Sequence, residues 1–294
     1  MKFWRSQQGG GILLMLLATC TFAALDTTTK HAISLVPVLM LLWFRYAFQA
    51  AFTFAMRMPT QGFGIFITPN PRLQFTRGAL AITSSAFGFY SLQHLPVAEF
   101  TSIAMLSPMF ATALAAVTLK NHVSLRRWAW MSLGLMGVLL VVRPGGQVFG
   151  WALIFPILMV CSFGAFQVIT SRLSGEESPY TTHFYTGLVG AIGMLPLVMF
   201  AWDSAALLAH WPWFVAVGLL STFGHLMLIR AYNRASAVVI TPYQYSQLAF
   251  ATLAGWLVFG HTPDALAWAG IAVIAASGIG NGLVTIQEAG LKRQ

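Results

Sequence analysis

Long apolar runs separated by short polar connectors fill almost the whole of this 294-residue chain. Each run is close to the ~20 residues that a helix needs to cross a hydrocarbon layer ~30 Å thick. A backbone in lipid has no water to bond, so every run is expected to form a helix. The pattern predicts ten transmembrane helices, at residues 10–31, 37–56, 72–92, 98–118, 127–143, 149–171, 181–201, 210–231, 237–258 and 264–285.

The composition excludes an ordinary soluble domain. Hydrophobic residues make up 57% of the chain and charged residues only 8%, whereas a soluble domain carries about 25% charged residues. A lipid bilayer is therefore the expected surroundings. The net charge of +9 would suggest nucleic acid in a soluble protein, but these cations are scattered among the connectors. We expect an all-α integral membrane protein that binds no nucleic acid.

The positions of lysine and arginine predict the orientation, because cytoplasmic loops carry an excess of both. With the N-terminus in the cytoplasm, Lys30 and Arg143 fall outside and Arg45 lies within a span, which leaves 13 of the 16 cations inside. Arg77 is counted among these inner cations. Both termini are therefore expected in the cytoplasm, and the protein in a bacterial inner membrane. The inner cations are Lys2, Arg5, Arg57, Arg72, Arg77, Lys120, Arg126, Arg127, Arg172, Arg230, Arg234, Lys292 and Arg293.

The two halves of the chain resemble each other. CTFAALDTTTKHA at 20–32 matches CSFGAFQVITSRL at 161–173 at an offset of 141, and Ser107 and Leu114 match Ser246 and Leu253 at an offset of 139. The first run is thus kept as a helix and not read as a cleaved signal sequence. Residues 1–147 and 148–294 are predicted to be two five-helix repeats. Because five is odd, the second repeat is inverted relative to the first, an arrangement typical of transporters that alternate between two shapes.

The chain resembles the ten-helix EamA-type branch of the drug/metabolite transporter superfamily. The resemblance rests on FAALDTTTK, LLWFRYAFQ, YSLQHLPVAEFTSIAMLSPMFATALAAVTL and LIRAYNRASAVVITPYQYSQLAFATLAGWLVFG, among other stretches. It implies a central cavity lined by helices of both halves, with the fifth and tenth helices peripheral. It also implies transport of amino acids, purines, S-adenosylmethionine or other metabolites. The family's Gly-Glu loop is replaced by Asn121-His122 and Gly260-His261.

Ionisable groups inside the predicted spans are the first candidates for function, because each costs roughly 2.5–3.5 kcal/mol to insert. Arg45 either holds a carboxylate of the substrate or of a neighbour, or pairs with Asp26 or with helix-end carbonyls. Asp26 either carries a coupling proton, or is a structural partner of Arg45, or lies at a solvated helix end beside Lys30. His225 either bonds between helices or faces a cavity. Glu99, in a first helical turn, is expected to complement the helix dipole.

Polar and aromatic residues beside prolines complete the predicted site. Ser107-Pro108 and TPYQYSQ at 241–247 are matching positions in the two halves, and each proline permits a kink. Recognition of an amino acid needs hydrogen-bonding groups together with an apolar or aromatic wall. The alternative is packing between helices. The predicted substrate-binding residues are Arg45, Tyr90, Ser107, Gln167, Tyr185, His225, Tyr243, Gln244 and Gln247, with Asp26 as a possible coupling residue.

These features predict a secondary transporter that exports amino acids, aromatic or otherwise neutral, by alternating access. The chain has no GxxxxGK phosphate loop, so ATP is not expected to drive it. Uptake of S-adenosylmethionine or a nucleoside-like metabolite is the alternative transport reading. A lipid-modifying membrane enzyme is the alternative outside transport, although the acids are dispersed. We expect a small-molecule substrate, no cofactor, no metal, no enzymatic activity and a functional monomer.

Overall fold

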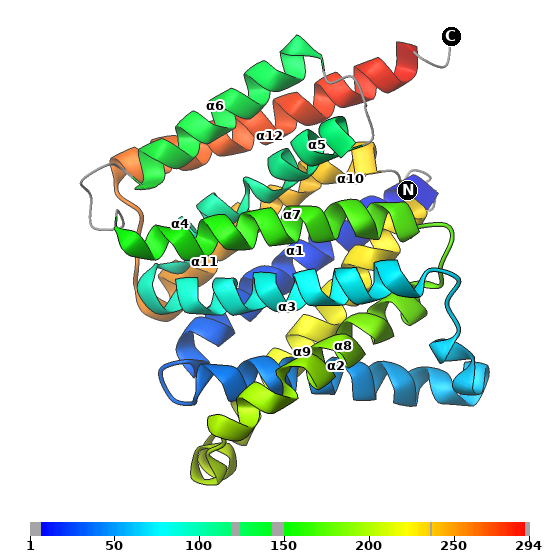
Figure 1. Ribbon diagram of the computed structural model, residues 1–294. Helices are drawn as coiled ribbons and strands as arrows, with labels where there is room; N and C mark the ends of the chain where they lie inside the picture. Colours follow the sequence, from blue (N-terminus) through cyan, green and yellow to red (C-terminus); the bar gives the residue numbers. More distant parts are fainter. Residues whose placement is uncertain (1–6, 119–123, 143–149, 236, 292–294) are drawn as a thin grey trace.

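The computed structural model describes residues 7–118, 124–142, 150–235 and 237–291, and these residues form helices throughout (Figure 1). No strand occurs in those ranges, apart from one isolated bridge between Ser174 and Glu177. The α-helices are α1 Gln7–Ala32, α2 Val38–Gln61, α3 Pro71–His94, α4 Val97–Ala104, α5 Ser107–Thr118, α6 Leu125–Val142, α7 Ile154–Leu173, α8 Pro179–Phe200, α9 Ser204–Arg234, α10 Ala237–Gln244, α11 Ser246–Phe259 and α12 Ala265–Leu291. Two short 3-10 helices, η2 Gly62–Phe66 and η3 Trp151–Leu153, precede α3 and α7.

The helices of the described ranges form ten segments, because α4–α5 and α10–α11 are each one segment with a break. Eight helices in these ranges are long and apolar enough to cross a membrane. Of the two remaining segments, α3 has the length but carries many polar residues, and α10–α11 is interrupted at Tyr245. The predicted fold class, an all-α integral membrane protein, is confirmed.

The breaks in α4–α5 and α10–α11 lie beside the prolines that the sequence singled out. Pro108 is the second residue of α5, directly after the turn at 105–106, and Pro242 lies within α10. A proline has no N–H to donate, so it leaves a carbonyl of the preceding turn without its helical partner. Both broken segments are therefore bent near the middle of the molecule.

Equivalent helices of the two halves run in opposite directions. Figure 1 shows α1 crossing the molecule one way and α7 crossing it the other way. The start of α1 and the end of α12 lie on the same side, which we call the terminal side, and α1 ends on the far side. An even number of crossings has this result. The proposed boundary between residues 147 and 148 lies outside the described residues.

Packing sorts the helices into two bundles that each combine both halves of the sequence. In the α1 bundle, α1 packs on α9, α10 and α11, and α2 packs on α9. In the α3 bundle, α7 packs on α3, α4 and α5, and α8 packs on α3. The second set of contacts repeats the first with the halves exchanged. Contacts between α2 and α8 join the two bundles. Helices α6 and α12 pack on each other and lie at the edge of the molecule (Figure 1).

Arg77, which the sequence analysis assigned to the cytoplasmic side, lies inside the protein. Its side chain is fully buried and donates to the hydroxyls of Thr170 and Thr186 and to the carbonyl oxygen of Thr182. Its bonding partners show that Arg77 faces α7 and α8. It ties the α3 bundle together. The inner cations Lys2, Arg5, Lys120, Lys292 and Arg293, together with Arg143 and the loop residues Asn121 and His122, lie outside the described residues.

Candidate substrate-binding cavity

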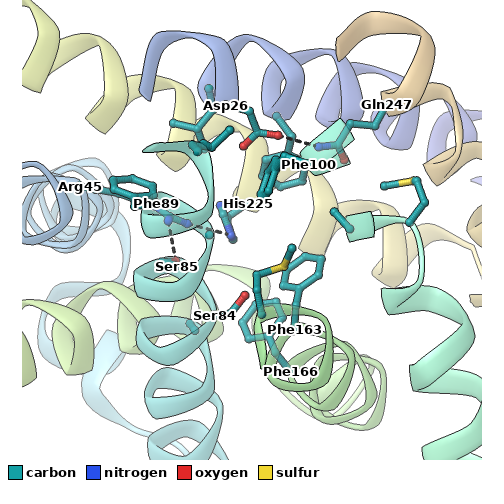
Figure 2. A pocket seen from close by; sticks show the side chains of 18 residues that line it. Asp26, Arg45, Ser84, Ser85, Phe89, Phe100, Phe163, Phe166, His225 and Gln247 are labelled. Atoms are coloured by element: carbon teal, nitrogen blue, oxygen red, sulfur yellow. Dashed lines mark hydrogen bonds between the residues drawn. The ribbon is translucent and has the colours of Figure 1, made fainter. Parts of the chain in front are cut away.

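A cavity lies between the two bundles, near the centre of the helices (Figure 2). Its walls come from α1, α2, α9 and α11 of one bundle and from α3, α4 and α7 of the other. Its volume is about 110 Å³, which is smaller than the about 300–1,000 Å³ of typical pockets for small ligands. Its position suits a small metabolite held between two bodies that can move apart.

Arg45 of α2 is the cation of the cavity, and its side chain is 5% exposed. Its Nε donates to Ser221 Oγ at 2.6 Å and its Nη1 to Ser85 Oγ at 2.5 Å. Its Nη2 lies 3.4 Å from His225 Nε2. All three partners are neutral side chains, since His225 Nδ1 lies 2.9 Å from the Ser221 carbonyl oxygen and must donate to it, leaving Nε2 to accept. Three neutral groups thus hold the guanidinium, and no carboxylate of the described residues lies within 4.0 Å of it.

Asp26 of α1 is the acid of the cavity. Its Oδ2 accepts a hydrogen bond of 3.1 Å from Gln247 Nε2 of α11. Figure 2 shows this pair on one wall and Arg45 with Ser85 on another. Asp26 and Arg45, both within the described ranges, are not joined by an ion pair of 4.0 Å or less. The cavity therefore presents a cation and an anion that are free to meet opposite charges on one ligand.

Aromatic side chains make up most of the remaining wall. Phe22, Phe89, Phe100, Phe163 and Phe166 line the cavity together with Met105 and Met159. Phe163 and Phe166 are stacked at 5.5 Å between ring centroids, and Phe22 meets the edge of His225 at 4.9 Å. Walls of this composition are typical of sites for flat or apolar ligands.

A second cavity continues from the first toward the terminal side. Both are lined by Phe22, Ala104, Met105, Phe163 and Gln247. The second adds Thr19, Ser107, Gln167 and Gln244, which lie nearer the terminal side on their helices. Its polar lining is uncharged, so it offers hydrogen bonds where the first offers charges. The two cavities lie along one path through the molecule.

The structure brings seven of the ten predicted residues to these cavities. Asp26, Arg45, His225 and Gln247 line the first, and Ser107, Gln167, Gln244 and again Gln247 line the second. The other three face elsewhere. Tyr90 stacks on Phe155 at 5.8 Å on the outer surface, Tyr185 donates to the Phe66 carbonyl oxygen beside η2, and Tyr243 lines neither cavity. These three tyrosines are therefore not part of the proposed site.

Sequence reasoning missed the face of α3. Ala81, Ser84, Ser85, Gly88 and Leu92 all line the first cavity. They recur at intervals of three and four residues, which places them on one helical face. This periodicity of small residues was visible in the sequence, but small residues also serve in ordinary packing between helices. The position of α3 opposite α1 and α9 shows that these small residues line a cavity and do not only pack between helices.

Hydrogen bonds join the two bundles near both ends of the path. On the far side, Lys30 Nζ donates to the carbonyl oxygens of Leu92 and Leu95 at 2.9 and 2.8 Å. On the terminal side, Ser174 Oγ donates to the Tyr232 carbonyl oxygen at 3.0 Å. Each bond runs from the end of α1 or α7 to the end of α3 or α9, so the two are equivalent in the two halves. They must break in turn if the bundles rock.

Glu99 does more than complement the dipole of α4. On the far side its Oε1 lies 2.9 Å from Nε2 of His261, the residue that replaces a glutamate of the family loop. Glu99 belongs to the α3 bundle and His261 follows α11 of the α1 bundle. The pair is therefore a further contact between the bundles at the far end of the path.

Comparisons with known proteins agree with this geometry. The model of the EamA-like transporter family matches residues 9–143 and 150–281. The chain is 30% identical over 274 residues to a riboflavin transporter from Rhizobium johnstonii, which covers 92% of this chain and 89% of the relative. It is 27% identical to a pseudopaline exporter from Pseudomonas aeruginosa, with 91% and 94% covered. It is 24% identical to an S-adenosylmethionine uptake transporter from Rickettsia prowazekii, with 86% of each covered.

A solved crystal structure shares the fold. It superposes with a TM-score of 0.68 at 17% sequence identity and covers 95% of this chain and 98% of its own. The superposition spans both halves, so the arrangement of all ten segments is shared. With the family matching both halves and with relatives named as transporters of small molecules, the chain is a multi-pass membrane protein that belongs to the EamA-like transporter family.

Proposed function

We propose that the protein is a secondary transporter for a small amphipathic metabolite that carries a carboxylate. The observation that carries this proposal is Arg45, which is buried in the cavity wall and has no carboxylate within 4.0 Å among the residues that the structure describes. A buried guanidinium is costly unless an anion meets it. A substrate carboxylate supplies that anion, and its departure leaves the three neutral partners to hold the side chain.

Aromatic or other neutral amino acids, exported across the inner membrane, are the first candidates. Arg45 would take the carboxylate, Asp26 the ammonium group, and the phenylalanine wall the side chain. The same groups favour a second candidate, S-adenosylmethionine uptake, since that molecule joins an amino-acid group to a flat ring. The Rickettsia prowazekii relative is named for this activity.

Alternating access follows from the two bundles. The path has a cavity between the bundles and inter-bundle hydrogen bonds at either end. Rocking that breaks the Lys30 bonds would open the far side, and rocking that breaks the Ser174 bond would open the terminal side. Residues 1–147 and 148–294, as inverted repeats, would give the two open shapes similar energies, which a transporter needs.

Substrate counterflow in proteoliposomes tests the proposed function. Vesicles loaded with unlabelled compound are diluted into labelled phenylalanine, threonine, riboflavin or S-adenosylmethionine, with protein-free vesicles as the control. We expect phenylalanine to exchange about tenfold faster than threonine, because burying its ring adds at least about 1.4 kcal/mol. Exchange of S-adenosylmethionine alone would favour the second candidate. Failure of every carboxylate-bearing compound, with riboflavin exchanging, would exclude the proposed substrate class.

We also propose that the terminal side faces the cytoplasm. Arg57, Arg72, Arg172, Arg230 and Arg234 all lie on helix ends of that side. Single cysteines at Glu176 and Thr262, in a chain lacking Cys20 and Cys161, test this assignment. A membrane-impermeant maleimide added to intact cells should label Thr262→Cys and spare Glu176→Cys. The reverse labelling would show that the terminal side faces outward.

A further inference from the structure

Two arginines meet one tyrosine at the terminal side, away from the cavity. The guanidinium carbon of Arg57, near the end of α2, lies 4.2 Å from the ring centroid of Tyr180, the second residue of α8. The guanidinium carbon of Arg230, near the end of α9, lies 6.0 Å from the same centroid. All three side chains are half-buried. Three helices from both bundles thus place two positive charges beside one ring.

No acid neutralises these two charges in the described part of the chain. Arg57 Nε donates only to Gln61 Oε1, at 3.4 Å, and neither Arg230 nor the Tyr180 hydroxyl makes a hydrogen bond within the described ranges. The nearby acids are engaged elsewhere, since Glu177 accepts from Thr68 and Glu176 from Asn70. Two half-buried guanidiniums within about 6 Å of one ring centroid concentrate positive charge there, which an anion would offset. The arrangement is therefore suited to an anionic ligand.

An aromatic row on the α2–α9 seam leads from these cations toward the middle of the membrane. Phe48 and Phe52 of α2 are stacked at 6.0 Å, and Phe52 meets the edge of Phe223 of α9 at 5.4 Å. Phe52 precedes Arg57 by ~7 Å along α2, and Phe223 precedes Arg230 by ~10 Å along α9. Phe223 is exposed. An apolar chain lying on this row would have its polar end at the arginines.

We propose that Arg57, Tyr180 and Arg230 bind the phosphate of an anionic phospholipid, whose acyl chain lies along Phe48, Phe52 and Phe223. The arginine forks and the tyrosine hydroxyl donate hydrogen bonds to the phosphate oxygens. Basic positions at the ends of transmembrane helices attract such lipids. Inorganic phosphate shares the headgroup chemistry but lacks the chain that the aromatic row would hold, so the site distinguishes the two sources by the apolar contact.

Native mass spectrometry of the detergent-purified full chain tests this site. Phosphatidylglycerol and phosphatidylcholine are added in equal amounts to the wild type and to two double variants. Arg57→Gln with Arg230→Gln removes the proposed site, whereas Arg72→Gln with Arg172→Gln removes the same charge from exposed positions on the same side. We expect the wild type and the Arg72/Arg172 variant to retain phosphatidylglycerol. The Arg57/Arg230 variant should retain about tenfold less, because it loses at least one charge-assisted hydrogen bond to the lipid.

Thermal unfolding gives a second measurement that does not depend on retention in the gas phase. Phosphatidylglycerol should raise the Tm of the wild type and of the Arg72/Arg172 variant, and should leave the Arg57/Arg230 variant unchanged. Conservative Arg57→Lys and Tyr180→Phe variants, which keep the packing, should show intermediate shifts. Equal phosphatidylglycerol binding by both double variants would overturn the site. Full displacement by inorganic phosphate at equal concentration would overturn the assignment to a lipid.

Discussion

An Arg45→Gln variant should bind a carboxylate-bearing substrate about 10- to 100-fold more weakly, because a charge-assisted hydrogen bond contributes about 1.5–3 kcal/mol. Glutamine retains the ability to bond Ser221 or Ser85 but has no charge to offer a carboxylate. The loss should appear as a raised KM in counterflow for every substrate with a carboxylate. A compound without one should be affected little.

Two controls separate substrate binding from the structural bonds of Arg45. Ser221→Ala removes the acceptor of the Nε bond yet leaves the guanidinium in place, and Ser221 does not line the first cavity. It should change KM much less than Arg45→Gln does, because it removes a hydrogen bond within the protein and keeps the charge that would meet the carboxylate. Arg45→Lys keeps the charge without the fork and should fall between wild type and Arg45→Gln. If folded Arg45→Gln protein has the wild-type KM for substrates with a carboxylate, then Arg45 has only a structural role.

An Asp26→Asn variant should exchange substrate with a raised KM, because it loses the charge proposed to meet the ammonium group, and should fail to accumulate substrate under a pH gradient. Asparagine can still bond Gln247 but cannot carry a proton, so the coupling step is lost while the path stays open. With one proton coupled, a gradient of one pH unit supplies about 1.4 kcal/mol, enough for a tenfold concentration ratio. We therefore expect a ratio of about ten for the wild type and about one for Asp26→Asn. Labelled substrate inside proteoliposomes with an imposed gradient measures it.

Asp203→Asn is the matched control for this experiment. Asp203 is exposed and caps α9 by accepting from the Ala206 backbone N–H. Asparagine caps a helix about as well, so this variant changes an acid to an amide without touching the path. It should accumulate substrate as the wild type does. Gradient-driven accumulation that survives in Asp26→Asn would assign the coupling to another group or to facilitated diffusion.

The apolar runs predicted the helices closely, because a bilayer dictates their length and their internal hydrogen bonds. The expected run at 72–92 became α3, Pro71–His94, and the run at 181–201 became α8, Pro179–Phe200. The breaks in α4–α5 and α10–α11 followed from Pro108 and Pro242. Helix bounds and breaks depend on residues that are close together in the chain, so they can be predicted from a single sequence.

The site was predicted less completely, because it depends on which face of each helix meets the cavity. Arg45 could be predicted as a functional candidate, because a cation inside a transmembrane span is costly. Its partners Ser85 and Ser221 could not, because nothing in the sequence distinguishes them from other small polar residues. Tyr90 and Tyr185 resembled binding residues, yet they turn outward to Phe155 and Phe66. Rotation about a helix axis is set by the other helices, and a single sequence does not show them.

Mixing of the halves within each bundle has a consequence for synthesis. The first half leaves the ribosome with Arg77 and Arg45 already in lipid, while Thr170, Thr182 and Thr186 for one and Ser221 and His225 for the other are still untranslated. Until those residues arrive, both guanidiniums lack most of their native partners. The nascent chain must therefore stay sheltered at the translocon, or draw water into the bilayer, until its eighth crossing, α9, is inserted.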